Sequence, residues 1–351
     1  MIQIVNWLLT RRCNYKCGYC GLVRNYPDQP TYYPSVLDLA KKELSSEKVI
    51  ECLRMFKLHN PNIFIILYGG EPFLFNGIGD VLAYCNKENI QYTIITNGSD
   101  FSRKTLRDLL KNKVIDYLQG LTCSVDPIST SSKIKDVDYK TQSGVQTLLE
   151  FKDISKDRVA EITLTTENLP NAMDLLRFLT NEGICADITS IDLRFNSAYD
   201  FSNIPRSNYN LVLHKTKEVK DFIDVVVSDK SLIIHMREVL KKFYEILPRN
   251  HCWSLPLPRE VHNISIDADG ALRLCLRIRG RGLINVTNLL DIGGNIINFD
   301  YLKQTEAEDR QLLCDGCNWP CRLFSKETAN NPSSVSDLLH LGVRNNEKIS
   351  N

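Results

Sequence analysis

The sequence lacks a marked excess of either charge, since 43 lysines and arginines stand against 42 aspartates and glutamates, a net charge of +1. A chain with this balance does not coat a polyanion by bulk charge alone, so we expect no nucleic-acid partner. A local basic patch is still compatible with this composition. The 351 residues allow one large domain or two ordinary ones, and either can bury a core.

Long hydrophobic runs are also missing. The longest apolar stretches, such as Ile63 to Leu67, are far shorter than the roughly 20 residues that a membrane-spanning helix needs. Residues 1–9 contain no positively charged segment and no small-residue cleavage site, which excludes a secretory signal peptide. We therefore expect a cytoplasmic protein without a membrane partner.

Histidine is scarce, with 6 residues, whereas the 12 cysteines are plentiful. Without a secretory signal these cysteines are not expected to form disulfides, because the cytosol keeps thiols reduced. Most of them gather near the two ends of the chain. Four are scattered singly and are expected to pack as small hydrophobic residues, namely Cys52, Cys85, Cys123 and Cys185.

Short β-branched runs alternate with helical patterns from Gln3 to about Asn196. The expected strands cover residues 4–9, 63–67, 92–95, 117–125, 160–165 and 186–195, and the expected helices cover 47–59, 78–87, 103–112, 143–151 and 172–180. Ser46 and Ser102 are expected to cap the first and third of these helices. The alternation predicts an α/β fold with a parallel sheet. Six units are too few for a full barrel, so we expect a partial (β/α)6 TIM barrel with a lateral opening.

Cys13, Cys17 and Cys20 form a CxxxCxxC motif on the loop after the first expected strand. Three thiolates on a short, glycine-containing loop can converge on one cube of iron and sulfide. Three ligands for four irons would leave one iron free to bind another molecule. The alternative is a three-cysteine zinc site completed by a distant residue, although no histidine lies nearby.

A second motif, Tyr68 followed by Gly69, Gly70, Glu71 and Pro72, comes directly after the second expected strand. Two glycines allow the backbone to approach a ligand, and their amide and carbonyl groups can bind its polar head. A simple Gly-Gly turn is the alternative interpretation.

These two motifs together closely resemble the radical S-adenosylmethionine (SAM) superfamily, over roughly Gln3 to Asn196. In that family, CxxxCxxC binds a [4Fe–4S] cluster whose open iron is chelated by the amino and carboxylate groups of SAM. The resemblance implies that Tyr19 lies near the adenine and that residues 69–72 contact the methionyl amine. Tyr68 departs from the family pattern, in which a small residue or threonine is usual.

Three further segments also resemble the family's strand ends: residues 96–98, 124–126 and 165–168. The resemblance implies cofactor-binding roles for Asn97, Ser124 and Asn168. It also implies an enzyme in which the reduced cluster cleaves SAM to methionine and a 5′-deoxyadenosyl radical, which then abstracts a substrate hydrogen. Such a radical must be kept from solvent, and a barrel interior suits that need.

The cysteines near the other end of the chain form a second group: Cys252, Cys275, Cys314, Cys317 and Cys321. They accompany an expected hairpin with strands at 263–267 and 272–281 and a turn at Asp269-Gly270. The pattern resembles the auxiliary-cluster domains called SPASM and twitch. Five cysteines suffice for one auxiliary [4Fe–4S] cluster. The resemblance to twitch favours the first four as ligands, with Cys321 as competitor, and a four-cysteine zinc knuckle is the alternative.

The expected domain organisation follows from these motifs. Residues 1–205 are expected to form the radical SAM partial barrel, residues 206–330 helices and a small α+β auxiliary-cluster domain, and residues 331–351 a polar tail. The barrel begins only a few residues before Cys13, so we expect no fused leader-peptide-binding domain at the N-terminus.

Arginines alternate along the expected strand 272–281, where Arg277 and Arg279 share a face with Cys275. One interpretation is a solvated strand face. The other is that these arginines hold an anionic group of the substrate beside the cluster. Arg194, near the end of the sixth expected strand, is either a substrate contact or part of a structural ion pair.

The resemblance predicts a substrate class less sharply than a reaction type. Relatives with SPASM or twitch domains modify ribosomally made peptides and proteins, or oxidise small sugars and aminocyclitols. Modification of a peptide or protein is the favoured prediction. Oxidation or rearrangement of a small sugar, aminocyclitol or nucleotide-like molecule is the alternative, followed by a non-catalytic Fe–S or zinc scaffold. A flavodoxin or ferredoxin is the electron donor that the family implies.

Overall fold

The computed structural model describes residues 4–15, 17, 43–126, 142–155, 157–190, 216–235, 237, 240, 263–270, 272–273 and 286. Within them a single eight-stranded sheet has the order β6-β5-β4-β3-β2-β1-β7-β8. The strands are β1 Ile4–Thr10, β2 Phe64–Gly69, β3 Gln91–Thr96, β4 Leu118–Ser124, β5 Asp157–Leu164, β6 Cys185–Ser190, β7 Asn263–Ile266 and β8 Leu272–Arg273.

Strands β1 to β7 are all parallel, and only β8 runs antiparallel to its neighbour. This arrangement confirms the predicted α/β fold of a partial TIM barrel. Strand β7, expected in the second domain, pairs with β1 and so extends the barrel sheet itself. The division of the chain into domains stays a prediction.

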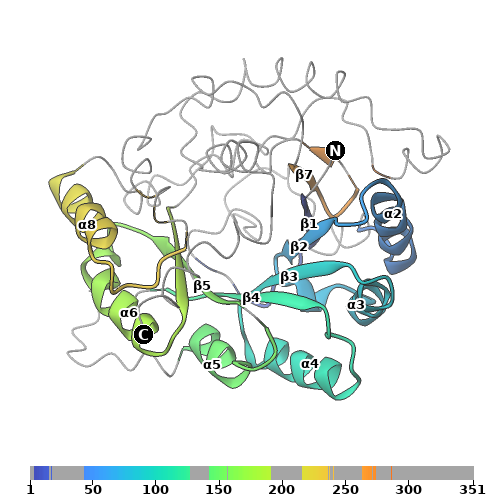
Figure 1. Ribbon diagram of the computed structural model, residues 1–351, viewed down its shortest axis with the longest axis horizontal. Helices are drawn as coiled ribbons and strands as arrows, with labels where there is room; N and C mark the ends of the chain where they lie inside the picture. Colours follow the sequence, from blue (N-terminus) through green and yellow to red (C-terminus); the bar gives the residue numbers. More distant parts are fainter. Residues whose placement is uncertain are drawn as a thin grey trace, which may run out of the picture.

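Helices cover the outer side of the curved sheet (Figure 1). They are α2 Ser46–His59, α3 Ile78–Lys87, α4 Asp100–Lys111, α5 Ser143–Glu150, α6 Leu169–Asn181 and α8 Lys217–Ser228, with a short 3-10 helix, η1, at Pro72–Leu74. Each of the five predicted helices is present as α2 to α6, within a few residues of the expected bounds.

Two predicted helix caps are wrong by one and three residues. Ser45, not Ser46, caps α2, and Ser99, not Ser102, caps α4. Both true caps have extended backbone and accept a hydrogen bond from the backbone N–H three residues later. Helix α4 begins earlier than predicted because Asp100 adds a favourable negative charge to its first turn.

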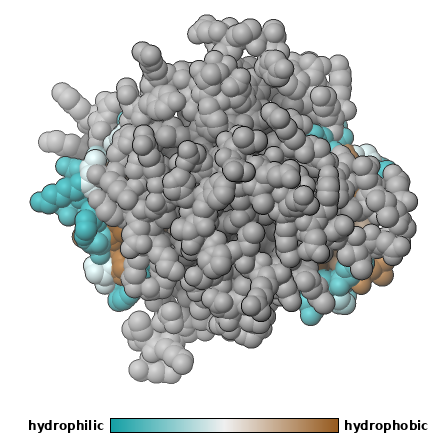
Figure 2. Space-filling model, turned by 90° about the horizontal axis from the view of Figure 1, so that it is seen from above, coloured by the Kyte–Doolittle hydropathy of each residue, from teal (hydrophilic) through white to brown (hydrophobic). Residues whose placement is uncertain are grey.

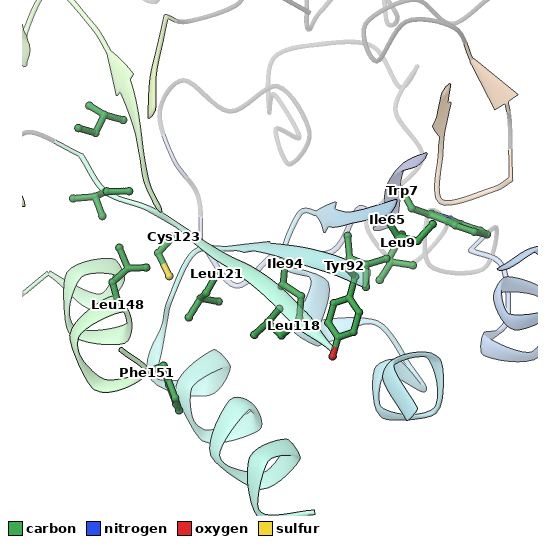
Figure 3. Close-up of a cluster of buried hydrophobic side chains, with 14 of the residues drawn as sticks. Trp7, Leu9, Ile65, Tyr92, Ile94, Leu118, Leu121, Cys123, Leu148 and Phe151 are labelled. Atoms are coloured by element: carbon green, nitrogen blue, oxygen red, sulfur yellow. The ribbon is translucent and has the colours of Figure 1, made fainter. Parts of the chain in front are cut away.

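The core lies between the sheet and these helices. Alternate residues of each strand point toward the helices, so Leu121 and Cys123 of β4 share a face, and Figure 3 shows Cys123 beside Leu148 of α5. The four single cysteines are all buried, which confirms their predicted packing role. Burial raises the pKa of Cys52 and Cys85 to about 12, so both thiols stay protonated at neutral pH.

The opposite face of the sheet is more polar. Because side chains alternate along a strand, the residues between the core positions face away from the helices. They include Asn6, Thr93, Thr122, Glu161 and Asp187, all at most partly exposed. The concave side of the barrel therefore offers hydrogen-bonding groups rather than a purely apolar wall.

Hydrophilic side chains of the described part are visible at the flanks of the molecule. In Figure 2 teal side chains lie at both flanks, with smaller hydrophobic patches beside them. Among the described residues, no helix combines the length and hydrophobicity needed to cross a membrane.

Candidate metal centre and cofactor site

The predicted site residues gather at one edge of the sheet, because parallel strands bring their carboxyl ends together. The register places Thr10 of β1 beside Gly69 of β2, and Thr96 of β3 beside Cys123 of β4. Each motif predicted from the sequence begins at such a strand end. The described members at this edge are Cys13, Cys17, Gly69, Gly70, Glu71, Pro72, Asn97, Ser124 and Asn168.

Two cysteines of the CxxxCxxC motif are described, and both Cys13 and Cys17 are partly exposed thiols outside any disulfide. The sulfur of Cys13 accepts hydrogen bonds from the backbone N–H of Tyr15 at 3.4 Å and from Nδ2 of Asn97 at 3.6 Å. Donors aimed at a sulfur are typical of thiolate ligands in iron–sulfur sites. The residues therefore fit a soft, thiolate-ligated metal group, although no complete set of three ligands occurs within the described ranges.

The two glycines of the second motif bring the end of β2 against the loop that carries the cysteines. Gly70 donates its N–H to Thr10 at 2.7 Å, and Glu71 donates to the carbonyl of Arg12 at 2.8 Å. A Cβ at Gly70 would stand 2.2 Å from the carbonyl oxygen of Arg12, and one at Gly69 would stand 2.4 Å from that of Thr10. Backbone contact within the protein thus requires these glycines, and the Gly70 amide, one of the two that sequence analysis assigned to a ligand, is already used.

The carboxylate of Glu71 is fully buried and joins the ends of β2 and β3. It accepts hydrogen bonds from Oγ1 of Thr96 at 2.8 Å, from the backbone N–H of Asn97 at 2.8 Å and from that of Phe73 at 3.3 Å. The last bond caps η1. Burial raises the pKa of Glu71, and the hydrogen bonds oppose that rise.

Asn97 continues this link to the cysteine loop. Its Oδ1 accepts the backbone N–H of Ser99 at 3.0 Å, and its Nδ2 donates to Oδ1 of Asn14 at 2.7 Å as well as to Cys13. Asn14 in turn donates to Oγ of Ser99 at 2.9 Å. The predicted cofactor-binding residue Asn97 is therefore in direct contact with a predicted cluster ligand.

Ser124 and Asn168 lie at the ends of neighbouring strands, but they differ in exposure to solvent. Ser124 is exposed at the end of β4. Asn168 is buried, and its side chain accepts from the backbone N–H of Thr165 at 2.7 Å and donates to the carbonyl of Thr163 at 2.9 Å. The Asn168 amide thus closes the turn between β5 and α6, which is a local role common for this residue type.

Sequence analysis missed the ion pairs that anchor the cysteine loop. Glu43 accepts from Oγ1 of Thr10 at 2.5 Å and pairs with Arg12 at 3.0 Å. Arg11 forms a buried ion pair with Asp267, which follows β7. The one available signal was the Arg11-Arg12 pair between an apolar strand and Cys13, and it did not identify the distant partners.

The remaining predicted site residues lie outside the described residues. They are Tyr19, Cys20, Arg194, Cys252, Cys275, Arg277, Arg279, Cys314, Cys317 and Cys321.

Comparisons with known proteins match the part of the chain that contains the first two motifs. Residues 7–129 match the family model described as Radical SAM superfamily. The chain is 22% identical over 191 residues to an S-adenosylmethionine-dependent nucleotide dehydratase of Psychrobacter lutiphocae, and the match covers 50% of this chain and 60% of that protein. It is 25% identical to the GTP 3′,8-cyclase of Aquifex aeolicus, over 61% of this chain and 64% of that protein. Both of these matches thus span less than two thirds of the relative's length.

Solved structures show the same fold at low identity. The native enzyme anSMEcpe, solved with bound AdoMet and a peptide, aligns with a TM-score of 0.55 and 17% identity over 99% of both chains. Streptococcus suis SuiB, solved with the precursor peptide SuiA, aligns with a TM-score of 0.55 and 13% identity over 83% of this chain and 64% of that one. Residues 7–129, the part of this chain that contains β2 to β4 and both described cysteines of the motif, therefore match the radical SAM superfamily of enzymes.

Proposed function

We propose that Cys13, Cys17 and Cys20 hold a [4Fe–4S] cluster and that SAM binds beside it, at the carboxyl ends of β1 to β5. When bound, the cluster supplies the electron that cleaves SAM to methionine and a 5′-deoxyadenosyl radical, which abstracts a hydrogen from the substrate. The observation that carries this proposal is the pair of N–H donors directed at the Cys13 sulfur, at the strand edge where the other motifs end.

The chain's own residues serve this chemistry by fixing one loop. Gly70 and Glu71 hold the backbone of residues 10–12 against the end of β2. The exposed hydroxyl of Ser124 and backbone carbonyls of the glycine segment are proposed to contact SAM, with Tyr19 near the adenine. Glu71, Asn97 and Asn168 are proposed to shape the SAM site through the hydrogen bonds described above rather than through free side chains.

A second [4Fe–4S] cluster is proposed for the C-terminal cysteines, with Cys252, Cys275, Cys314 and Cys317 as ligands and Cys321 as the competitor. The support is their spacing around the expected hairpin, where Gly270 of the turn has left-handed backbone, with φ of 83°. Arg194, Arg277 and Arg279 are proposed to contact an anionic part of the substrate. A flavodoxin or ferredoxin is proposed as the electron donor.

The proposed substrate is a ribosomally made peptide or protein. Support comes from the two solved relatives, each of which was determined with a peptide bound. A nucleotide is the second candidate, because several relatives found by sequence are named as nucleotide dehydratases and one as a GTP cyclase.

Anaerobic reconstitution with iron and sulfide, followed by dithionite and SAM, tests the proposed chemistry. We expect about eight irons per chain and formation of 5′-deoxyadenosine. Replacing Cys13, Cys17 and Cys20 together by Ala should remove about four irons and all 5′-deoxyadenosine, whereas Cys85→Ala, at a buried core position, should remove neither. Full activity in the triple variant would overturn the proposal.

The substrate class is tested by the same assay with additions. Short peptides encoded beside the protein's own gene and the common nucleoside triphosphates are added separately, and 5′-deoxyadenosine formation and substrate mass are followed. Stimulation and a mass change with a peptide support the first candidate. The same response with a nucleotide alone would replace it by the second.

A further inference from the structure

The amide of Asn97 has only one orientation that its neighbours allow. Its Oδ1 accepts from the backbone N–H of Ser99 at 3.0 Å, and a backbone N–H cannot act as an acceptor. A flipped amide would place its NH2 group against that N–H. The NH2 group must therefore face Asn14 and the sulfur of Cys13, which lies 3.6 Å away.

The backbone of Asn97 is also fixed by hydrogen bonds to Glu71. Its backbone N–H is bound by the buried carboxylate of Glu71 at 2.8 Å, and the preceding Thr96 donates its hydroxyl to the same carboxylate. Asn14 and Ser99 complete the network around the amide. A donor fixed in this way stays directed at the sulfur whether or not the charge on that sulfur changes.

We propose that Asn97 sets the reduction potential of the cluster by donating a hydrogen bond to the Cys13 thiolate, an inference that rests on the proposed function. One-electron reduction adds a negative charge to the cluster and its sulfurs. A hydrogen-bond donor interacts more strongly with the more negative form, so it raises the potential. Asn97 thereby makes the cluster easier to reduce by an electron donor of the flavodoxin or ferredoxin class.

Two variants separate this role from a purely structural one. Asn97→Asp keeps an oxygen that accepts from Ser99 but replaces the donor with a negative charge. Asn97→Ser removes the donor without adding charge, and its hydroxyl can still accept in a similar turn. Asn86→Asp is the matched control, because Asn86 lies in the last turn of α3 and its Oδ1 accepts the backbone N–H of Tyr117 just before β4, at the opposite edge of the sheet.

The experiment is a redox titration of the reconstituted full-length protein, followed by electron paramagnetic resonance. The signal that changes when SAM is added identifies the cluster at Cys13. At the wild-type midpoint, the ratio of reduced to oxidised cluster should fall about threefold in Asn97→Ser and about tenfold in Asn97→Asp, where tenfold corresponds to about 59 mV for one electron. Asn86→Asp should keep the wild-type ratio.

Each other outcome contradicts the proposal. Wild-type ratios in both loaded Asn97 variants would show that the hydrogen bond does not set the potential. Loss of the cluster from both variants would assign Asn97 to loop assembly instead. A wild-type protein that takes up no SAM-responsive cluster would overturn the proposed function and this inference together, and is distinguished by the absence of any SAM-dependent change in its electron paramagnetic resonance signal.

Discussion

At the scale of single residues, the glycines of the second motif show how one missing atom positions a metal ligand. A Cβ at Gly70 would overlap the carbonyl oxygen of Arg12, which stands directly before Cys13. The neighbouring atoms are backbone and cannot move aside as a flexible side chain could. The backbone before Cys13 can therefore take this position only because Gly70, at the end of β2, has no side chain.

Gly70→Ala is expected to displace the cysteine loop. After reconstitution, the variant should bind at this site at most half of the iron that the wild type binds there. The matched control is Gly79→Ala in α3, where a Cβ would meet only Cδ2 of Leu109 at 3.7 Å. That helical substitution should raise the free energy of unfolding by about 0.5–1 kcal/mol. Iron analysis and urea unfolding measure the two effects, and equal iron in both variants would contradict the argument.

At the scale of elements, Glu71 is the junction between β2 and β3. Its carboxylate is buried and accepts hydrogen bonds from Thr96 and Asn97 at the end of β3, while it caps η1 after β2. Burying an ionised carboxylate is costly, and the hydrogen bonds offset only part of that cost. The hydrogen bonds thus fix the geometry of this junction, while burial of the ionised carboxylate lowers the free energy of unfolding.

The raised pKa of Glu71 predicts a direction of pH dependence. Between the ordinary glutamate pKa of about 4.3 and the raised value, the folded state binds more protons than the unfolded state, so the Glu71 contribution falls as pH rises. The free energy of unfolding of the wild type, minus that of Glu71→Gln, should increase as pH is lowered from 7 toward 5. Urea unfolding at several pH values measures this difference, and a flat or opposite trend would refute the assignment.

At the scale of the whole molecule, a buried ion pair joins segments far apart in the chain. Arg11 follows β1, and Asp267 follows β7, 256 residues later. Both side chains are almost completely buried, and Asp267 also accepts the N–H of Ala268 at 2.8 Å. The pair fixes β7 and its turn to the base of the cysteine loop.

Removal of one partner leaves the other charge buried, so Asp267→Ala should lower the free energy of unfolding by about 3–5 kcal/mol. The double variant Arg11→Met with Asp267→Leu should recover most of this loss, because no charge then remains unpaired. Lys220→Ala, which breaks the exposed pair with Asp224 in α8, should cost at most about 0.5 kcal/mol. Equal losses in the Asp267 and Lys220 variants would contradict the proposed importance of burial.

Sequence analysis predicted the parts of the molecule that depend on local pattern. The six barrel strands and five helices were found because apolar periodicity and strand-end motifs are local signals. The caps at Ser45 and Ser99 were missed because another serine, one and three residues later, satisfies the same preference. Glu43 and Asp267 were not predicted at all, because nothing near them in the sequence indicates a partner at Arg12 or Arg11. The auxiliary cysteines stay a prediction outside the described residues.

The contact between Thr10 and Glu43 has a consequence for how this protein can change over evolution. Their side chains meet at 2.5 Å and clamp together the two ends of the segment that contains the cysteine motif. For a contact that closes a loop, doubling the number of residues in the loop adds only about 0.6 kcal/mol to the entropic cost of closure. A change in the number of residues between Thr10 and Glu43 therefore alters the closure cost of this contact only slightly, so the contact can persist in relatives whose segments differ in length.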